Sequence, residues 1–190
     1  MARDKIEFVK AALRRPLEVS TVFPTSRPLA EKLLSFADLK NADHVVELGS
    51  GTGAITQHLE PRLKPRASFL GIEIDEPMVK YLREKFPKLR FEAGPADMLS
   101  QLVPASSVDA VVSSLPWTIF PDEVQSSTIN AISHALKPSG VFVTYICANA
   151  LWYPQARAFT RKLETTFRDV HRSDLEWRNI PPAFVFRSTR

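Results

Sequence analysis

The sequence predicts an α/β protein, a single doubly wound domain with a mostly parallel sheet behind a helical N-terminal extension. Short apolar segments alternate with helical patterns of about ten residues, which is typical of parallel strands covered by helices on both faces. Three of only six glycines, Gly49, Gly51 and Gly53, follow the first apolar segment directly. The 190 residues suffice for one such domain. We expect the sheet domain at 41–190 and amphipathic, lid-like helices at 1–40.

The composition is that of an ordinary globular protein. Hydrophobic residues make up 44% and charged residues 24% of the chain, which excludes a disordered or collagen-like protein. The single cysteine, Cys147, excludes a disulfide framework and a cysteine-rich zinc site. The net charge of +4 is uneven, because residues 1–40 carry 8 basic and 5 acidic side chains, residues 41–150 carry 9 and 12, and residues 151–190 carry 8 and 4. This favours a neutral or cationic ligand in the middle of the chain and an anionic surface at its ends, with ordinary variation of surface charge as the alternative.

No segment is expected to span a membrane. The most apolar window, 141–153, contains Thr144 and Asn149 and is shorter than the ~18–20 residues that a span needs. The first residues are charged from Arg3 onward and lack the apolar core of a signal peptide. We therefore expect a cytoplasmic protein, or one bound peripherally to the inner face of the cytoplasmic membrane.

The elements are expected from the periodicity of apolar residues and from turn signals. The expected strands are 44–48, 68–74, 89–92, 108–113, 141–146, 167–171 and 183–187. The expected helices are 3–14, 27–36, 54–63, 76–86, 122–136 and 155–164. The last two strands follow each other without a helix, which predicts an antiparallel closing pair.

Local signals mark where several of these elements begin or end. Ser26 and Asp75 are expected to cap the helices that follow them. Asp122 with Gln125 three residues later has the spacing of a capping box. The stretch 137–140, Lys-Pro-Ser-Gly, is expected to be a turn before the fifth strand.

The segment V-V-E-L-G-S-G-T-G-A-I-T at 45–56 has the order strand, glycine turn, helix start. Glycines let the backbone bend sharply and let a ligand approach a helix N-terminus, as in dinucleotide-binding loops. Glu47 argues against a pyrophosphate, because its carboxylate would repel the phosphates of NAD or FAD. S-adenosylmethionine instead carries an ammonium and a sulfonium, which a nearby carboxylate favours. The loop therefore predicts a site for this methyl donor, with a buried or capping role for Glu47 as the alternative.

A second carboxylate, Glu73, follows the second strand in the stretch G-I-E-I-D. A carboxylate at this place in a nucleotide-binding sheet can accept both hydroxyls of an adenosine ribose. Alone, Glu73 is equally typical of a turn before a helix. Together with the glycine loop it predicts a donor site at the carboxyl ends of the strands.

These motifs, E-L-G-S-G-T-G and G-I-E-I-D, resemble those of class I S-adenosylmethionine-dependent methyltransferases. The resemblance implies a Rossmann-like sheet with strand order 3-2-1-4-5-7-6 and one antiparallel strand. In that family an acidic residue after the third strand often holds the adenine amino group; here Pro95 takes that place and Asp97 is the nearest substitute. The residues that the resemblance brings to the cofactor are Glu47, Gly49, Ser50, Gly51, Gly53, Glu73, Ile74 and Asp97.

The stretch S-S-L-P-W at 113–117 follows the fourth strand and is expected to receive the methyl acceptor. Its pattern of a polar residue, any residue, proline and an aromatic residue resembles that of amino-group methyltransferases. Proline fixes the turn, so that Ser114 and a backbone carbonyl can accept hydrogens from the attacking amine and orient its lone pair. Trp117 is expected to cover the developing cation. The alternative is a proline turn with Trp117 in the core.

Three stretches resemble bacterial phospholipid N-methyltransferases, and together they run over essentially the whole chain. They are R-R-P-L-E-V-S-T-V-F-P-T-S-R at 14–27, V-V-S-S-L-P at 111–116 and W-R-N-I-P-P-A-F-V-F-R at 177–187. The resemblance implies stepwise N-methylation of phosphatidylethanolamine to phosphatidylcholine. Ornithine lipid methyltransferases are not separated from these enzymes by the motifs. Ribosomal RNA adenine dimethylases, which have N-L-P-Y where this chain has S-L-P-W, remain a further alternative.

The same resemblance assigns roles to residues near the acceptor. Tyr145 matches a tyrosine of the family and joins Ser114, Leu115 and Pro116 as a catalytic candidate, with a core aromatic as the alternative. Arg178 and Asn179 are candidates for holding the lipid phosphate, although a surface ion pair fits Arg178 equally well. No metal is expected, since the four histidines show no ligand spacing.

The first helix is expected to be basic and amphipathic, which is typical of a segment lying on an anionic membrane. Packing against the sheet domain is the alternative. Nucleic acid is not expected as a partner, because no separate RNA-binding domain or aromatic platform is visible. The membrane-binding candidates are Lys5, Phe8, Lys10, Arg14 and Arg15.

Overall fold

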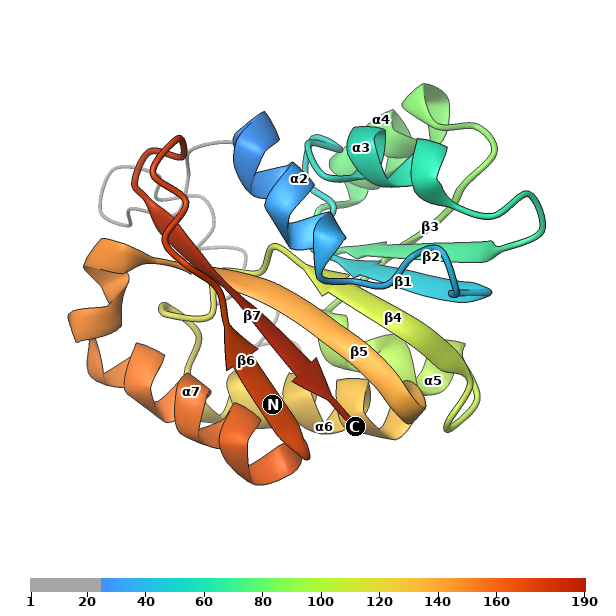
Figure 1. Cartoon of the computed structure of the whole chain (residues 1–190). Coiled ribbons are helices and arrows are strands. Elements are labelled where there is room, and N and C mark those ends of the chain that lie inside the picture. The colour runs from blue at the N-terminus through green and yellow to red at the C-terminus, as the bar shows by residue number, and fades with distance from the viewer. Residues whose placement is uncertain (1–24) are drawn as a thin grey trace.

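The computed structural model describes residues 25–190, and Figure 1 shows a twisted sheet between two layers of helices. The expected helix 3–14 and the five membrane-binding candidates lie outside these residues. The strand order is β3-β2-β1-β4-β5-β7-β6, which confirms the expected fold class. The strands are β1 (His44–Leu48), β2 (Ser68–Glu73), β3 (Arg90–Ala93), β4 (Val108–Ser113), β5 (Leu136–Cys147), β6 (Asp169–Arg172) and β7 (Ala183–Thr189).

Helices cover both faces of the sheet. One layer holds α2 (Arg27–Ser35), α3 (Thr56–Leu59) and α4 (Glu76–Lys85), and the other holds α5 (Leu99–Leu102), α6 (Asp122–Ala135) and α7 (Pro154–Thr166) (Figure 1). Short 3-10 helices are η1 (Glu60–Arg62), η2 (Ala96–Met98) and η3 (Ala148–Trp152). No helix among residues 25–190 is long and apolar enough to cross a membrane.

The central strands β1 and β4 are buried on both faces, since four of the five residues of β1 and five of the six of β4 are buried. This explains why both read as nearly continuous apolar runs. Strands β1 to β5 are parallel, and β7 is antiparallel to β5 and β6. The expected antiparallel closing pair is confirmed. The carboxyl ends of β1, β2 and β4 therefore meet at one edge.

Residues 137–140, expected as a turn, form a bulge inside a longer β5. The register against β4 shifts here, because Val108 lies opposite Leu136 and Ala110 opposite Val141. Ser139 takes up the bulge with a positive φ of 68°. The extra residues let β5 start five residues early and still join β4 in register, which the Pro-Ser-Gly signal did not reveal.

The expected caps are confirmed in position, but two of them lack the capping hydrogen bond. Asp75 is the N-cap residue of α4 without a side-chain bond, and Asp122 begins α6 as expected, although its N-cap residue is Pro121. Gln125 does not complete a capping box, because its amide is buried and donates to the backbone oxygens of Trp117 and Gln155. Ser26 does cap α2, since its Oγ accepts from the Leu29 amide at 3.4 Å.

Candidate active site

The glycine loop links the carboxyl end of β1 to α3. Gly49, Gly51 and Gly53 all have positive φ, at 77°, 51° and 79°, a region that residues with a Cβ adopt at a cost. A Cβ at Gly53 would lie 2.5 Å from the Phe86 ring, whereas one at Gly51 would meet only a backbone oxygen at 4.0 Å. Gly53 is therefore required for packing, and Gly51 leaves the backbone open to a ligand.

Glu73, at the end of β2, faces this loop. Its Oε2 accepts from the Gly51 amide at 2.8 Å and its Oε1 from the Asp75 amide at 3.1 Å. These two bonds fix the carboxylate, and each oxygen keeps a second lone pair. The group is therefore oriented to accept a pair of hydroxyls such as those of a ribose.

Glu47 is fully buried at the end of β1, beneath the loop. Its Oε2 accepts from the Thr56 hydroxyl at 2.7 Å, but its Oε1 has no hydrogen-bond partner among residues 25–190. Burial raises the pKa of Glu47 to about 8; the Thr56 bond opposes this and the charge of Glu73 adds to it. A buried acceptor without a donor is costly unless a ligand completes it. The arrangement fits a cationic ligand.

The acceptor turn, residues 113–117, is joined directly to the glycine loop. Ser114 donates from its Oγ to the Gly49 oxygen at 2.6 Å. The Leu115 amide donates to the Ser113 hydroxyl, and the Leu115 oxygen accepts from the Trp117 amide at 2.9 Å. Because the Ser114 proton is used on Gly49, the lone pairs of its oxygen remain to accept hydrogens from a ligand. The structure thus brings the donor loop and the acceptor turn together.

Tyr145 lies on β5 beside this turn. The register pairs Val112 with Val143, and continued by two residues it aligns Tyr145 with Ser114. The Tyr145 hydroxyl shares a hydrogen bond of 3.0 Å with Thr25. Burial raises the pKa of Tyr145 to about 12, although the Thr25 bond opposes the shift. The phenol is therefore neutral at physiological pH.

A family model described as a methyltransferase domain matches residues 45–140, from the start of β1 to the bulge in β5. This span is half of the chain and contains the glycine loop, Glu73 and the acceptor turn. The chain belongs to the methyltransferase domain family. S-adenosylmethionine is its cofactor, and the open Gly51, the fixed Glu73 carboxylate and the partnerless Oε1 of Glu47 fit that donor.

Curated relatives of this chain differ in how much of its length they match. An ornithine lipid N-methyltransferase from Singulisphaera acidiphila is 28% identical, over 97% of this chain and 95% of the relative. Ribosomal RNA small subunit methyltransferase A from Dehalococcoides mccartyi is 34% identical, over 51% of this chain and 34% of the relative. The chain thus spans about a third of that RNA enzyme.

Among solved structures, the O-methyltransferase TomG from Streptomyces achromogenes, in complex with SAM, has the same fold. The two superpose with a TM-score of 0.69 at 17% identity, over 97% of this chain and 89% of TomG. At this identity the likeness shows the fold alone. It agrees with the class I methyltransferase strand order found here.

The expected role of Trp117 is wrong in this methyltransferase. Its indole is 1% exposed, stacks on Phe159 at 4.4 Å between ring centroids, and meets Phe120 and Phe142 edge-on. The indole N–H donates to Thr144 at 2.9 Å. A ring enclosed by three aromatic neighbours cannot also cover an acceptor amine, so Trp117 anchors the turn in the core.

The two candidates for the lipid phosphate are already engaged. The exposed guanidinium of Arg178 donates from Nε to Glu176 at 3.0 Å, which is the surface ion pair left open by the sequence. This bond from Arg178 lowers the pKa of Glu176. Asn179 is buried, and its amide accepts from the Ser26 backbone N–H and donates to the Pro181 oxygen. Asn179 therefore joins α2 to the β6–β7 loop, and its expected contact with phosphate is wrong.

The remaining cofactor candidates keep their status as predictions. Ser50 is buried beside the loop, and its hydroxyl has no hydrogen-bond partner in the described part of the chain. Ile74 is half-buried directly after β2, and Asp97 is half-buried in η2 directly after β3. Both positions lie at the carboxyl ends of strands on the donor side of the sheet. Asp97 is thus where an adenine contact is expected.

Sequence reasoning missed two hydroxyls. Thr56 bonds Glu47, and its place at the start of the helix after a glycine turn was a usable signal. Thr25 bonds Tyr145 across 120 residues of sequence, and no local pattern predicts such a contact.

Proposed function

We propose that this methyltransferase transfers methyl groups from S-adenosylmethionine to the amine of a membrane-lipid head group. Phosphatidylethanolamine is the acceptor that we propose first, with mono- and dimethyl intermediates leading to phosphatidylcholine. The observation that carries the choice of a lipid is the extent of similarity. The lipid-methylating relative matches nearly the whole of both chains, whereas the RNA-methylating relative matches half of this chain and a third of itself.

Ornithine lipid is a second candidate acceptor. It is favoured by the name of the relative from Singulisphaera acidiphila, although 28% identity leaves room for a different head group. Both lipids present a primary amine on a flexible arm beside an anionic group. The chemistry at the acceptor turn is therefore the same for both.

The donor supplies an electrophilic methyl group on a sulfonium. The amine attacks it as the neutral base, so the N–C bond forms as the S–C bond breaks. After the first and second transfers the nitrogen loses a proton to solvent before it attacks again, and the third transfer leaves a quaternary ammonium that has no proton to lose. In the first two transfers Ser114 and the backbone oxygens of the turn accept hydrogens from the amine and direct its lone pair. Tyr145, with a raised pKa, acts as a neutral hydrogen-bonding group and not as a base. Glu47 and Glu73 hold the donor and do not exchange a proton with the amine.

A membrane-bound substrate requires the enzyme to reach a bilayer. We propose that residues 1–15, with Lys5, Phe8, Lys10, Arg14 and Arg15, bind the inner face of the cytoplasmic membrane. Removing residues 1–15 is expected to abolish sedimentation with anionic vesicles while leaving donor binding intact. Unchanged sedimentation would refute this role.

The acceptor is tested by incubating the protein with methyl-labelled donor and one of four acceptors. These are anionic vesicles with phosphatidylethanolamine, the same vesicles with ornithine lipid, vesicles with neither, and total RNA. Label in the first lipid supports the primary proposal, and label in ornithine lipid alone supports the second. Label in RNA alone would overturn both.

A further inference from the structure

Four large hydrophobic side chains are exposed on two neighbouring segments of the chain. Trp152 is 79% and Tyr153 49% exposed, at the end of η3 and the start of α7. Trp177 is 73% and Ile180 75% exposed, in the loop between β6 and β7. Among residues 25–190 the only other large hydrophobic residue so exposed is Tyr81 on α4. Large apolar side chains clustered at a surface mark an interaction site.

Both segments leave the sheet at the active-site edge. Cys147, the last residue of β5, pairs with Ala183, the first of β7, and the Ala148 amide donates to the Pro182 oxygen at 2.7 Å. Since β5 is parallel to β4, its carboxyl end lies at the edge where the acceptor turn emerges. In Figure 1 the orange segment before α7 and the red loop before β7 both project from this end of β5.

Positive charge that has no partner among residues 25–190 adjoins the aromatic side chains. Tyr153, Arg157 and Arg161 are spaced by four residues and follow one stripe of α7. Neither arginine side chain has an ion pair or hydrogen bond to another residue of 25–190. Both arginines line a groove on α7, together with Leu151, Ala156, Thr160 and, one turn further from the site edge, Glu164. The β6–β7 loop adds no such charge, since its Arg178 is paired with Glu176.

We propose that this aromatic–basic surface docks onto an anionic lipid bilayer. The surface is defined by Trp152, Tyr153, Arg157, Arg161, Trp177 and Ile180. Trp and Tyr favour the interfacial zone of bilayers, and arginines beside them are attracted by anionic head groups. Ile180 offers no face on which a nucleic-acid base could stack, which favours lipid over RNA.

Docking in this way would turn the carboxyl edge of the sheet toward the membrane. An amine in a head group would then reach Ser114 without the lipid leaving the bilayer. The proposal rests on the proposed function, because a membrane-lipid acceptor is what makes this orientation useful. It involves residues distinct from those of the N-terminal helix.

The three tryptophans provide the test. The full-length protein, without donor, is mixed with vesicles of phosphatidylcholine and phosphatidylglycerol that carry brominated acyl chains, which quench only nearby indoles. We expect quenching in the wild type, a partial loss of it in Trp152→Phe and in Trp177→Phe, and none in the double variant. Trp117, at 1% exposure, is the internal control.

Charge is tested by co-sedimentation with the same vesicles. Arg157→Gln with Arg161→Gln is expected to weaken binding at least tenfold and to reduce its salt dependence. The matched control is Arg66→Gln with Lys88→Gln. These two exposed cations precede β2 and β3 at the opposite edge of the sheet, and their loss is expected to leave binding unchanged. Circular dichroism verifies that all variants fold.

Several outcomes would overturn the proposal. Sedimentation without quenching would place the contact elsewhere, and quenching of indoles by RNA but not by vesicles would assign the surface to nucleic acid. Equal effects of the two double variants would mean that Arg157 and Arg161 contribute only to the net charge of the protein and not to a specific docking surface. Docking without label transfer to any lipid would refute the proposed function but not the docking surface. Lipid methylation without quenching would refute the docking surface but not the proposed function.

Discussion

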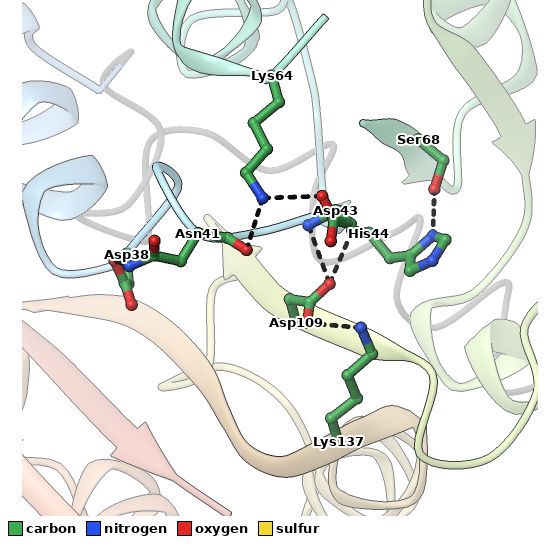
Figure 2. A network of polar contacts seen from close by, with 8 residues as sticks. All are labelled: Asp38, Asn41, Asp43, His44, Lys64, Ser68, Asp109 and Lys137. Atoms are coloured by element: carbon green, nitrogen blue, oxygen red, sulfur yellow. Dashed lines mark hydrogen bonds and ion pairs between the residues drawn. The ribbon is translucent and has the colours of Figure 1, made fainter. Parts of the chain in front are cut away.

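Each edge of the central sheet carries a carboxylate in a polar cluster, and the pKa values of the two carboxylates shift in opposite directions. At the amino edge, Asp109 accepts from the backbone amides of Asp43 and His44 and from Lys137, as Figure 2 shows. Although burial opposes it, the bond from Lys137 and the two amides lower the pKa of Asp109. At the carboxyl edge, Glu47 has one donor, and burial raises its pKa to about 8.

The difference separates a carboxylate that stabilises the fold from one that we expect to bind a ligand. Asp109 links β4 to the start of β1 and to the bulge of β5, so all of its partners belong to the chain (Figure 2). Glu47 is buried with Thr56 as its one donor among residues 25–190, and the lack of a partner for its Oε1 costs stability. Such a loss of stability in the free protein is typical of a binding site, where a bound cation compensates for it. The amino edge is thus built for stability and the carboxyl edge for binding.

The largest expected effect is at Glu73, whose two oxygens are held by the Gly51 and Asp75 amides. Glu73→Ala removes both the loop contacts and the oxygens that we expect to accept the donor's hydroxyls. We expect donor affinity to fall about 100-fold, roughly 3 kcal/mol, as for hydrogen bonds to a charged group. Isothermal calorimetry with S-adenosylmethionine measures it. An unaltered affinity would remove Glu73 from the site.

The next largest effect is expected at the amino edge of the sheet, at Asp109. Asp109→Asn leaves Lys137 without its ion-pair partner and is expected to lower the free energy of unfolding by about 2 kcal/mol at pH 7. Donor affinity should stay within twofold. Because the folded-state pKa of Asp109 is lowered, its stabilisation is present above the unfolded pKa and is lost as the pH falls through the folded one. In urea unfolding, the difference between variant and wild type should therefore be full at pH 7 and should narrow as the pH is lowered below 3.8.

Glu47 should show the opposite dependence on pH. Its raised folded pKa means that the folded protein holds a proton that the unfolded chain has lost between pH 4.5 and about 8. Its contribution to stability is therefore complete below pH 4.5 and is lost as the pH rises through 8. The loss should vanish in Glu47→Gln. Urea unfolding at pH 6 and pH 9 measures both proteins.

The same group links donor binding to proton release. If the donor's cation requires ionised Glu47, affinity should rise by up to about tenfold per pH unit between pH 6 and 8 and level off above. Calorimetry in buffers of different ionisation enthalpy should detect a proton released on binding in the wild type and none in Glu47→Gln. Equal proton release by both proteins would mean that Glu47 does not titrate on donor binding and has a structural role, as Asp109 does.

Much of this fold could be predicted because local pattern and global position agree. Apolar runs between turn signals located the seven strands, and the glycines at 49, 51 and 53 were needed for positive φ values that no other residue adopts cheaply. The bulge at 137–140 was missed for a physical reason. Its Lys137 is held by Asp109, which lies 28 residues earlier in the sequence, and nothing within the turn signals that bond.

The candidate site divides in the same way. Glu47 and Glu73 were predictable, since their chemistry depends on a single loop and on the strand ends beside it. Trp117 and Asn179 were not, because their roles are set by partners that the fold brings from afar. Phe159 lies on α7 and Ser26 at the start of α2, and only the assembled layers place them against these side chains.

The smallest effect concerns Ser114, the residue that connects the donor loop to the acceptor turn. Ser114→Ala removes the bond to the Gly49 oxygen, which stays partly solvated, so donor affinity should change by less than about threefold and stability by about 1 kcal/mol. The acceptor amine, however, loses one hydrogen-bond acceptor, and kcat should fall about tenfold. Ser114→Thr, which keeps the hydroxyl, should restore most of the rate. If Ser114→Ala lowered stability as much as Asp109→Asn and left kcat unchanged, Ser114 would have a structural role like that of Asp109 and no role in the reaction.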